Sequence, residues 1–324
     1  MALNVHFHHK REDVFFDELG KLLGPDITYT CSQTIPEKAN YDILVCGVPD
    51  KESIEASPNL RHLIIPWAGL PVKTRDLMLG YPDISIHNIH HNAVPVAEMA
   101  VAMMLALAKD LINIDTALRK NDWTPRYKTP ALRLMAEKTA LVVGFGAVGK
   151  EIALRCQALG MTVKAIRRTE QEISENGVDI YPVSRMKALL TEADVMFLSL
   201  PLTEQTKRLV GNRELSLLQN GTIVINISRG RIVEEQALYE ALKSRHIKAG
   251  LDVWYNYPDL QAGKSDVPPS EFPFGELDNV IMTPHLAGHS DMTEVLRARE
   301  LALLLNAASS GEPLPNRVEL QRGY

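Results

Sequence analysis

The segment that most constrains this fold runs from Leu141 to Ala153, where an apolar run ends in Gly144, Gly146 and Gly149. Their G-x-G-x-x-G spacing stands between an expected strand and an expected helix. The first glycine allows a tight turn, the second lets the backbone approach a pyrophosphate, and the third lets the helix pack closely. The phosphates would lie at a helix N-terminus, which favours anions. The motif predicts dinucleotide binding at Gly144, Gly146, Ala147, Val148 and Gly149.

The strand expected next, residues 161–166, indicates which dinucleotide is preferred. Enzymes that use NAD usually carry an acid at the end of this strand, where it holds the ribose hydroxyls. Here the strand is followed by Arg167, Arg168 and Thr169, without an acid. Guanidinium groups can clamp a 2′-phosphate through charge-assisted hydrogen bonds. We therefore expect NADP(H) to be favoured, with NAD(H) still possible; the alternative is that both arginines are merely solvated.

Length, charge and cysteine content narrow the class of protein. A chain of 324 residues predicts two domains, and its net charge of -5, without a basic block, argues against nucleic acid as a partner. The three cysteines form no C-x-x-C pair, which is typical of a reducing compartment. The N-terminus lacks a signal-peptide core, and no apolar run is long enough to span a bilayer. We expect a cytoplasmic protein with no membrane partner.

Short apolar runs alternate with helical patterns along the whole chain. Buried parallel strands are expected at residues 41–47 and 60–66, and further strands at 195–200, 222–227 and 279–283 and in the run that ends at residues 251–254. One long helix is expected from about Val94 to Lys120, and another from Thr293 to Ser309. This alternation of strands and helices predicts an α/β fold built on doubly wound parallel sheets.

Polar residues that can carry chemistry follow three of these strands. They are Arg229, Asp252 and His285. The carboxyl ends of parallel strands meet at one edge of a sheet, where ligands bind. Arginine can fork onto a carboxylate or carbonyl oxygen, and histidine can exchange a proton near neutral pH. The set indicates an oxidoreductase, although taken singly Arg229 could be a structural ion pair and His285 an ordinary loop histidine.

The chain resembles the D-isomer-specific 2-hydroxyacid dehydrogenase family over nearly its whole length. The motifs that carry the resemblance are Val143–Gly149, Leu200-Pro201-Leu202-Thr203 with Thr206, Asn226–Gly230, Leu251–Trp254 and Thr283-Pro284-His285. Upstream, Trp67-Ala68-Gly69 resembles the loop that binds the substrate carboxylate, and Asn92 precedes Val96-Ala97-Glu98 as a substrate-contacting asparagine does. Arg168-Thr169 looks like the NADPH-selecting turn of the family's glyoxylate and hydroxypyruvate reductases.

The resemblance implies an architecture. A Rossmann cofactor domain of residues 98–286 would be inserted into a flavodoxin-like substrate domain of residues 1–97 and 287–324, with the substrate in the cleft between them. Family members are usually homodimers joined through their cofactor domains. The helix at 94–120 and the arm around Trp123 would then belong to the dimer interface.

The resemblance also implies roles. Reduction of a small 2-oxo acid would use a hydride from NADPH, with Arg229 polarising the carbonyl and His285 protonating the alkoxide. Ala68, Gly69 and Asn92 would bind the carboxylate, Asp252 would hold the nicotinamide carboxamide, and Pro201, Thr206 and Ile227 would contact the cofactor. Which 2-oxo acid is reduced cannot be read from the sequence. The alternative is an NADP(H)-sensing regulator with little turnover.

One position departs from the family. Relatives carry an acid after the Leu-Asp-Val-aromatic strand that pairs with the catalytic histidine, and the matching residue here is Tyr257. A tyrosine can orient an imidazole by a hydrogen bond but brings no charge. Asp259 and Glu271 are alternative partners for His285. The loop at 259–274, rich in Pro, Ser and Gly, is either a lid or a surface excursion.

Two histidine clusters complete the candidates. His6, His8 and His9 are expected in an exposed strand and turn. His87, His90 and His91 precede Asn92, and His90 or His91 is expected to shape the substrate mouth. Neither cluster shows a full set of ligands, so no metal site is expected.

Overall fold

The computed structural model describes residues 2–35, 39–259, 263 and 265–323. The chain divides into two compact units, one of residues 1–92 with 289–324 and one of residues 93–288. The sequence predicted the divisions at 97/98 and 286/287. The first division lies before α4 (Ala93–Ala108), because this whole helix packs into the core of the second unit.

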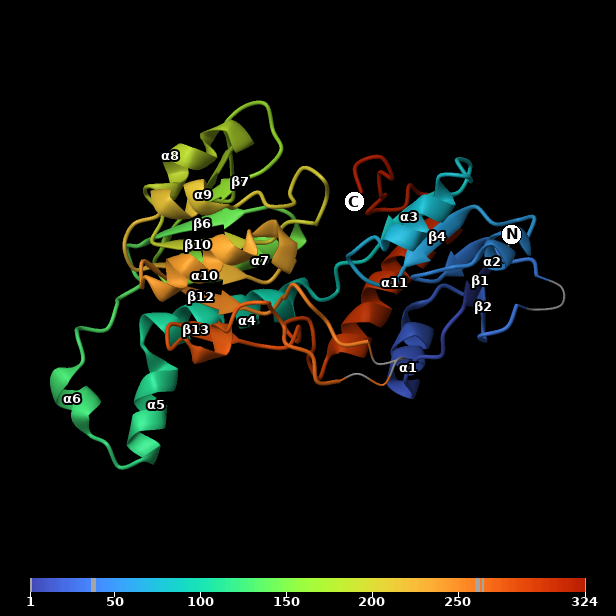
Figure 1. Ribbon diagram of the computed structural model, residues 1–324. Coiled ribbons are helices and arrows are strands. Elements are labelled where there is room, and N and C mark those ends of the chain that lie inside the picture. Colours follow the sequence, from blue (N-terminus) through green and yellow to red (C-terminus); the bar gives the residue numbers. More distant parts are fainter. Residues whose placement is uncertain (1, 36–38, 260–262, 264, 324) are drawn as a thin grey trace. The chain divides into compact units, whose positions relative to one another are not determined.

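The first unit contains a five-stranded parallel sheet in the order β2-β1-β3-β4-β5, which is the flavodoxin-like order. The strands are β1 (Leu3–Phe7), β2 (Ile27–Cys31), β3 (Ile43–Val45), β4 (His62–Ile65) and β5 (Ser85–Asn88). Side chains alternate between the faces. One face packs on α1 (Asp13–Leu22) and α11 (Thr293–Ser309), and the other on α2 (Lys51–Glu55) and α3 (Val72–Met78) (Figure 1).

The second unit contains an eight-stranded sheet in the order β13-β12-β11-β10-β6-β7-β9-β8. Its strands are β6 (Thr139–Val143), β7 (Thr162–Ile166), β8 (Ile173–Glu175), β9 (Val178–Tyr181), β10 (Val195–Leu198), β11 (Thr222–Asn226), β12 (Ile247–Leu251) and β13 (Val280–Met282). The order of the strands from β9 to β13 is that of a Rossmann fold with one further strand. Only β8 among these strands is antiparallel to its neighbour.

Helices cover both faces of this sheet. One face packs on α4 and α7 (Ala147–Ala158), and the other on α8 (Met186–Leu190), α9 (Asn212–Leu217) and α10 (Glu235–Lys243). Gly250 in β12 lets α4 approach, because a Cβ there would lie 2.9 Å from the Met103 Cβ. The expected α/β class and its parallel sheets are confirmed.

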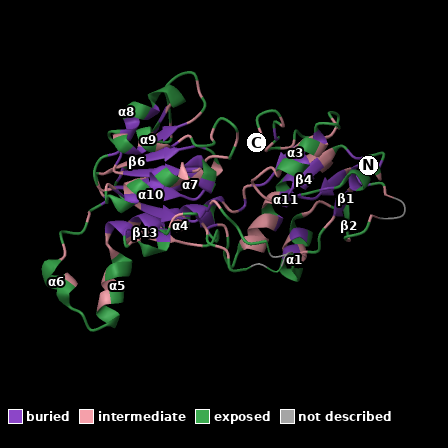
Figure 2. Ribbon diagram, viewed as in Figure 1, coloured by how far each residue is buried: buried purple, intermediate pink, exposed green. Residues whose placement is uncertain are grey.

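The expected long helix at 94–120 is two helices. Asp110 adopts a left-handed φ of 50° and separates α4 from α5 (Leu111–Arg119), which α6 (Thr124–Lys128) follows. These last two helices have no buried residues and project from their unit (Figures 1 and 2). The exposed apolar residues of this arm are Leu111, Ile112, Leu118, Trp123, Tyr127, Leu132 and Leu134.

Among the described helices, none combines the length and the apolar character that crossing a membrane requires.

Candidate active site

The glycine turn has the geometry that its spacing predicts. Gly144 has a φ of 102°, and a Cβ there would come within 2.5 Å of the Ser199 carbonyl oxygen. A Cβ on Gly149 would lie 2.1 Å from the Gly144 oxygen, so α7 packs directly on the turn. Gly146 precedes α7, and no heavy atom lies within 4 Å of its would-be Cβ. The helix N-terminus is thus open, and the turn fits a pyrophosphate.

The arginines after β7 differ in their surroundings. Nη1 of Arg167 lies 3.5 Å from Oε2 of Glu175. The other carboxylate oxygen of Glu175 accepts a 2.6 Å hydrogen bond from Lys150. That hydrogen bond is the largest cause of the lowered pKa of Glu175. The antiparallel strand β8, which the sequence analysis did not anticipate, brings this acid to the turn. Arg168 is exposed, and the Thr169 hydroxyl donates to the Gln171 carbonyl at 3.0 Å.

The loop after β10 is closed by its own hydroxyl groups. The Thr206 hydroxyl donates to the Pro201 carbonyl at 2.6 Å and accepts the Thr203 N–H at 2.8 Å. Thr206 therefore fixes the shape of this loop. The expected cofactor contact of Pro201 and Thr206 stays a prediction.

Arg229 is presented by a turn at the end of β11. The buried Asn226 side chain accepts the Ser228 N–H at 3.1 Å and donates to the Arg229 carbonyl at 3.1 Å. A Cβ on Gly230 would lie 2.3 Å from the Trp254 oxygen, so only glycine fits there. Ile227 is buried, whereas Arg229 is exposed. The Arg229 guanidinium donates to the Ser228 carbonyl at 2.6 Å, so it lies at the turn that follows the carboxyl end of β11.

Asp252 anchors the loop that carries His285. Its carboxylate is 1% exposed and accepts hydrogen bonds from the Thr283 hydroxyl at 2.6 Å and from the N–H groups of Leu286 and Ala287 at 2.9 Å each. His285 is exposed and has a left-handed φ of 60°. The three bonds flank His285 on both sides, so Asp252 holds an unusual backbone conformation in place.

Tyr257 lies beside His285. The two ring centroids are 5.6 Å apart with an interplanar angle of 53°. The Tyr257 hydroxyl accepts the Trp254 N–H at 3.0 Å. Burial raises its pKa, which the positive charge of Arg229 partly offsets. The tyrosine is therefore a neutral hydroxyl group at physiological pH, and it shares one region with Arg229 and His285.

Glu271 and Asp259 are the other two candidate partners of His285. Glu271 is exposed, and its N–H donates to Glu235 at 2.9 Å. Asp259 is exposed at the last position before residues 260–262, which lie outside the described residues. Ser270 donates to the same Glu235 oxygen at 2.6 Å, and Phe274 is buried. The segment of residues 270–274 is thus fixed to the second unit.

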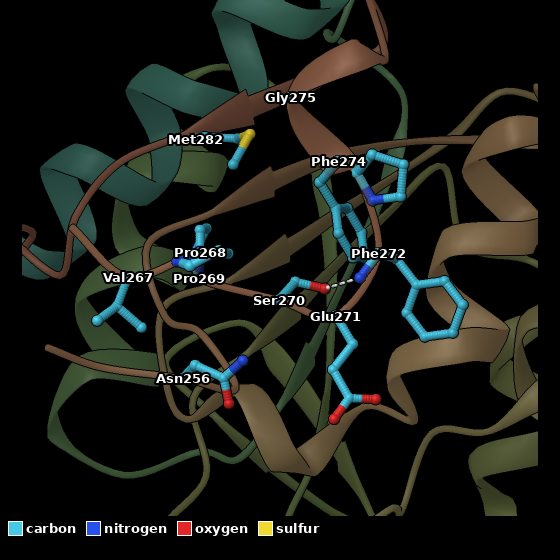
Figure 3. Close-up of a pocket in the computed structure, with 11 residues that line it drawn as sticks. Asn256, Val267, Pro268, Pro269, Ser270, Glu271, Phe272, Phe274, Gly275 and Met282 are labelled. Atoms are coloured by element: carbon cyan, nitrogen blue, oxygen red, sulfur yellow. Dashed lines mark hydrogen bonds between the residues drawn. The ribbon is translucent and has the colours of Figure 1, made fainter.

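This fixed segment borders a largely apolar pocket (Figure 3). Asn256, residues 267–275 and Met282 line it, and the Ser270 hydroxyl accepts the Phe272 N–H at 3.0 Å within its wall. Of the candidate site residues among those described, Glu271 lines this pocket, whereas Arg229, Tyr257 and His285 do not.

In the first unit, the candidate carboxylate loop follows β4. The Asn88 side-chain amide donates to the Ala68 carbonyl at 2.7 Å and so fixes Ala68 and Gly69. Asn92 has a buried Oδ1 with no hydrogen-bond partner among the described residues. An unpaired amide oxygen is an acceptor, so it is suited to a ligand group that donates a hydrogen bond. The expected binding of the substrate carboxylate by Ala68, Gly69 and Asn92 stays a prediction.

The three histidines before Asn92, which are His87, His90 and His91, differ in their contacts. Both His87 ring nitrogens have partners, Ser85 at 2.9 Å and the Pro315 carbonyl at 2.7 Å. The backbone N–H of His90 donates to the Glu300 carboxylate. Burial, assisted by positive neighbours, lowers the pKa of His91 to about 3, so its imidazole is neutral. A role of His90 or His91 at the substrate mouth stays a prediction.

No buried cysteine is an activated nucleophile. Burial raises the pKa of Cys46 to about 11 and that of Cys156 to about 12. Both thiols are therefore protonated at neutral pH, which excludes them as nucleophiles of the thiolate type.

A family model matches residues 101–287, described as the NAD-binding domain of D-isomer specific 2-hydroxyacid dehydrogenases. A glyoxylate reductase of Korarchaeum cryptofilum is 31% identical over 287 residues, covering 83% of this chain and 79% of the relative. A D-3-phosphoglycerate dehydrogenase of Archaeoglobus fulgidus is 33% identical over 296 residues, and the match covers 89% of this chain but only 53% of that relative. The chain thus spans about half the length of the latter protein.

Solved structures share the fold. A D-isomer specific 2-hydroxyacid dehydrogenase of Xanthobacter autotrophicus Py2, crystallised with NADPH, has a TM-score of 0.82 at 24% identity and full coverage of both chains. An NADPH-dependent glyoxylate/hydroxypyruvate reductase of Sinorhizobium meliloti has a TM-score of 0.78 at 21% identity, covering 99% of this chain and 100% of that one. The chain therefore belongs to the D-isomer specific 2-hydroxyacid dehydrogenase family of NAD(P)-dependent oxidoreductases.

Proposed function

We propose that the chain is an NADP(H)-preferring reductase of small 2-oxo acids. The observation that carries this proposal is the gathering of Arg229, Tyr257 and His285 in the second unit. These residues follow β11, β12 and β13, whose carboxyl ends lie on the same edge of the sheet as the glycine turn after β6. An exposed guanidinium and an exposed imidazole at this edge supply the two groups that carbonyl reduction needs.

The roles follow from the chemistry of these groups. NADPH supplies the hydride when it is bound. Arg229 binds the substrate carboxylate and stabilises the developing oxyanion, since a guanidinium offers paired donors in a fixed fork. His285 donates the proton to that oxygen.

The cofactor preference rests on the turn after β7. Arg168 is exposed there, and no acid occupies the position that NAD enzymes use for the ribose hydroxyls. Arg167 lies at the same turn, where its Nη1 is 3.5 Å from a carboxylate oxygen of Glu175. The solved relatives that were crystallised with NADPH or NADP are consistent with this preference.

The decisive experiment measures NADPH oxidation by the full chain with glyoxylate, hydroxypyruvate, pyruvate and bulkier 2-oxo acids. We expect saturable turnover with at least one of the small acids and slower turnover with NADH. Tight NADPH binding without turnover on any 2-oxo acid would refute the proposal and favour an NADP(H)-sensing regulator.

We also propose a homodimer that forms through the second unit. The arm of residues 111–134, which contains α5 and α6, exposes seven large apolar side chains, including Trp123 at 60% and Tyr127 at 77%. Large exposed apolar surface is typical of an interface. Trp123→Ser with Tyr127→Ser should convert a dimer to a monomer in analytical ultracentrifugation. Three free cysteines are consistent with a reducing compartment, and we propose the cytoplasm.

A further inference from the structure

Two imidazoles and one thiol meet at the carboxyl edge of the five-stranded sheet. His8 and His9 follow β1, and Cys46 follows β3. Their possible ligand atoms all lie within 4.8 Å of one another. None of the three has a role in the reductase proposed above. We propose that His8, His9 and Cys46 bind one thiophilic divalent cation of the zinc class.

Strand register brings two of these ligands together. In the parallel pair of β1 and β3, Phe7 lies opposite Val45. The His8 N–H donates to the Val45 carbonyl at 3.2 Å, which continues the pairing one residue beyond the strand. His8 is therefore level with Cys46, and the alternation of side chains places both on one face of the sheet. The His9 ring centroid lies 5.0 Å from that of His8.

One of the donor atoms lacks a partner in the protein. Nδ1 of His8 is buried and has no hydrogen-bond partner among the described residues. Burying such a nitrogen without a partner costs free energy, and a bound cation would remove that cost. Cys46 is fully buried and forms no disulfide. The site thus has an unsatisfied nitrogen and a buried thiol in the same place. Because that thiol is protonated in the metal-free protein, a cation that binds it as a thiolate must displace its proton to solvent.

The geometry is close to that of a tetrahedral zinc site. Zinc binds nitrogen at about 2.0–2.1 Å and thiolate sulfur at about 2.3 Å, which puts ligand atoms roughly 3.5 Å apart. The ligand atoms lie within 4.8 Å of one another, so their separations must shorten by roughly 1 Å. Small rotations of the side chains about χ1 and χ2 can supply this change. Three protein ligands leave the fourth position to water or a small molecule.

The donor atoms, rather than the surrounding charges, favour a thiophilic cation over Mg²⁺ or Ca²⁺. The positive charge of Arg11 acts on His9 and opposes any cation. The Asp50 carboxylate, whose pKa is lowered chiefly by hydrogen bonds from Ser53 and also by His8, partly offsets it. A nitrogen and sulfur ligand set selects Zn²⁺ and Co²⁺, whereas Mg²⁺ and Ca²⁺ require oxygen ligands.

The test is a Co²⁺ titration of the metal-free full chain at pH 8, with displacement by Zn²⁺. We expect one equivalent to bind and to produce a thiolate-to-cobalt charge-transfer band in the near ultraviolet. Cys46→Ser should abolish the band and weaken binding by roughly 100-fold. Mutation of residues that only support the ligands already costs roughly 10–100-fold in metal affinity, and loss of a ligand costs at least as much. Cys31→Ser is the matched control and should retain both, since Cys31 is exposed and outside the ligand set.

A second variant guards against misfolding, because Cys46 is buried. His8→Gln with His9→Gln should lower Co²⁺ affinity at least tenfold while the melting temperature in EDTA stays near that of the unmodified protein. Absence of the charge-transfer band in the unmodified chain would overturn the proposal. So would a band that survives Cys46→Ser or an affinity that the double histidine variant leaves unchanged. The readout is spectroscopic, so it is independent of reductase activity.

Discussion

The carboxylate of Asp252 allows the sharpest test of how the site is held together. The sequence analysis expected this residue to bind the nicotinamide carboxamide. In the structure, it accepts three hydrogen bonds from the His285 loop and is 1% exposed. We predict that Asp252→Asn misplaces His285 and lowers kcat more than it weakens NADPH binding.

The magnitude follows from the three bonds. An amide keeps one acceptor oxygen, so its NH2 group must face either the Ala287 N–H or the donors of Thr283 and Leu286. At least one charge-assisted bond is lost, which is worth about 1.5–3 kcal/mol, and the remaining bonds lose their charge. A total of about 3 kcal/mol corresponds to a fall of roughly 6–12 °C in the melting temperature of a unit of this size. A misplacement of about 1 Å at the reacting group can cost about 100-fold in rate.

The assay combines thermal unfolding, NADPH affinity by fluorescence and steady-state kinetics. Thr283→Val is the matched partial variant, because it removes one of the three bonds and leaves the carboxylate in place. It should show a smaller loss in both melting temperature and kcat. An Asp252→Asn protein with normal melting temperature and kcat but weakened NADPH binding would refute the anchoring role.

Three further predictions concern the cofactor turn and the catalytic groups. Arg168→Ala should weaken NADPH binding by about 1.5–3 kcal/mol and leave NADH nearly unchanged, because only NADPH carries the 2′-phosphate; equal losses measured by fluorescence titration would contradict this. Arg229→Lys should lower kcat/KM for the 2-oxo acid by at least roughly tenfold, since an ammonium group lacks the paired donors of a guanidinium. Near-normal kinetics would show that Arg229 does not bind the substrate through paired hydrogen bonds. Tyr257→Glu should move the alkaline fall of kcat/KM to higher pH, because a carboxylate stabilises the His285 imidazolium, and Tyr257→Phe should have only a small effect. An unchanged pH profile in the glutamate variant would show that residue 257 does not influence the protonation of His285.

The sequence predicted the features that depend on local spacing. The glycine turn could be identified because each glycine meets a steric requirement, such as the 2.1 Å approach at Gly149. Arg229, Asp252 and His285 could be located because parallel strands end at a common edge. The placement of Tyr257 beside His285 needed the family resemblance as well, since no periodicity indicates it.

The features that the sequence did not reveal depend on contacts between distant segments. Glu175 reaches Arg167 through the antiparallel strand β8, and this short strand has no distinctive pattern. The break at Asp110 is a single left-handed residue inside an apolar, helix-like run. The approach of His8 to Cys46 results from the register of two strands that are separated by a third in the sequence. Asn226 gave a weak signal, as a polar residue at the end of an apolar strand.

The ion pair between Glu175 and Arg167 has a consequence for cofactor choice. The protein carries its own anion at the turn, and a 2′-phosphate that approaches Arg167 must compete with it. Lys150 holds the same carboxylate by a 2.6 Å hydrogen bond, so the release of Arg167 would leave Glu175 still paired. We therefore expect selectivity between the two nicotinamide cofactors to depend on this exchange of partners as well as on the number of arginines. The edge strand β8, which carries Glu175, thereby becomes a place where that selectivity can be tuned.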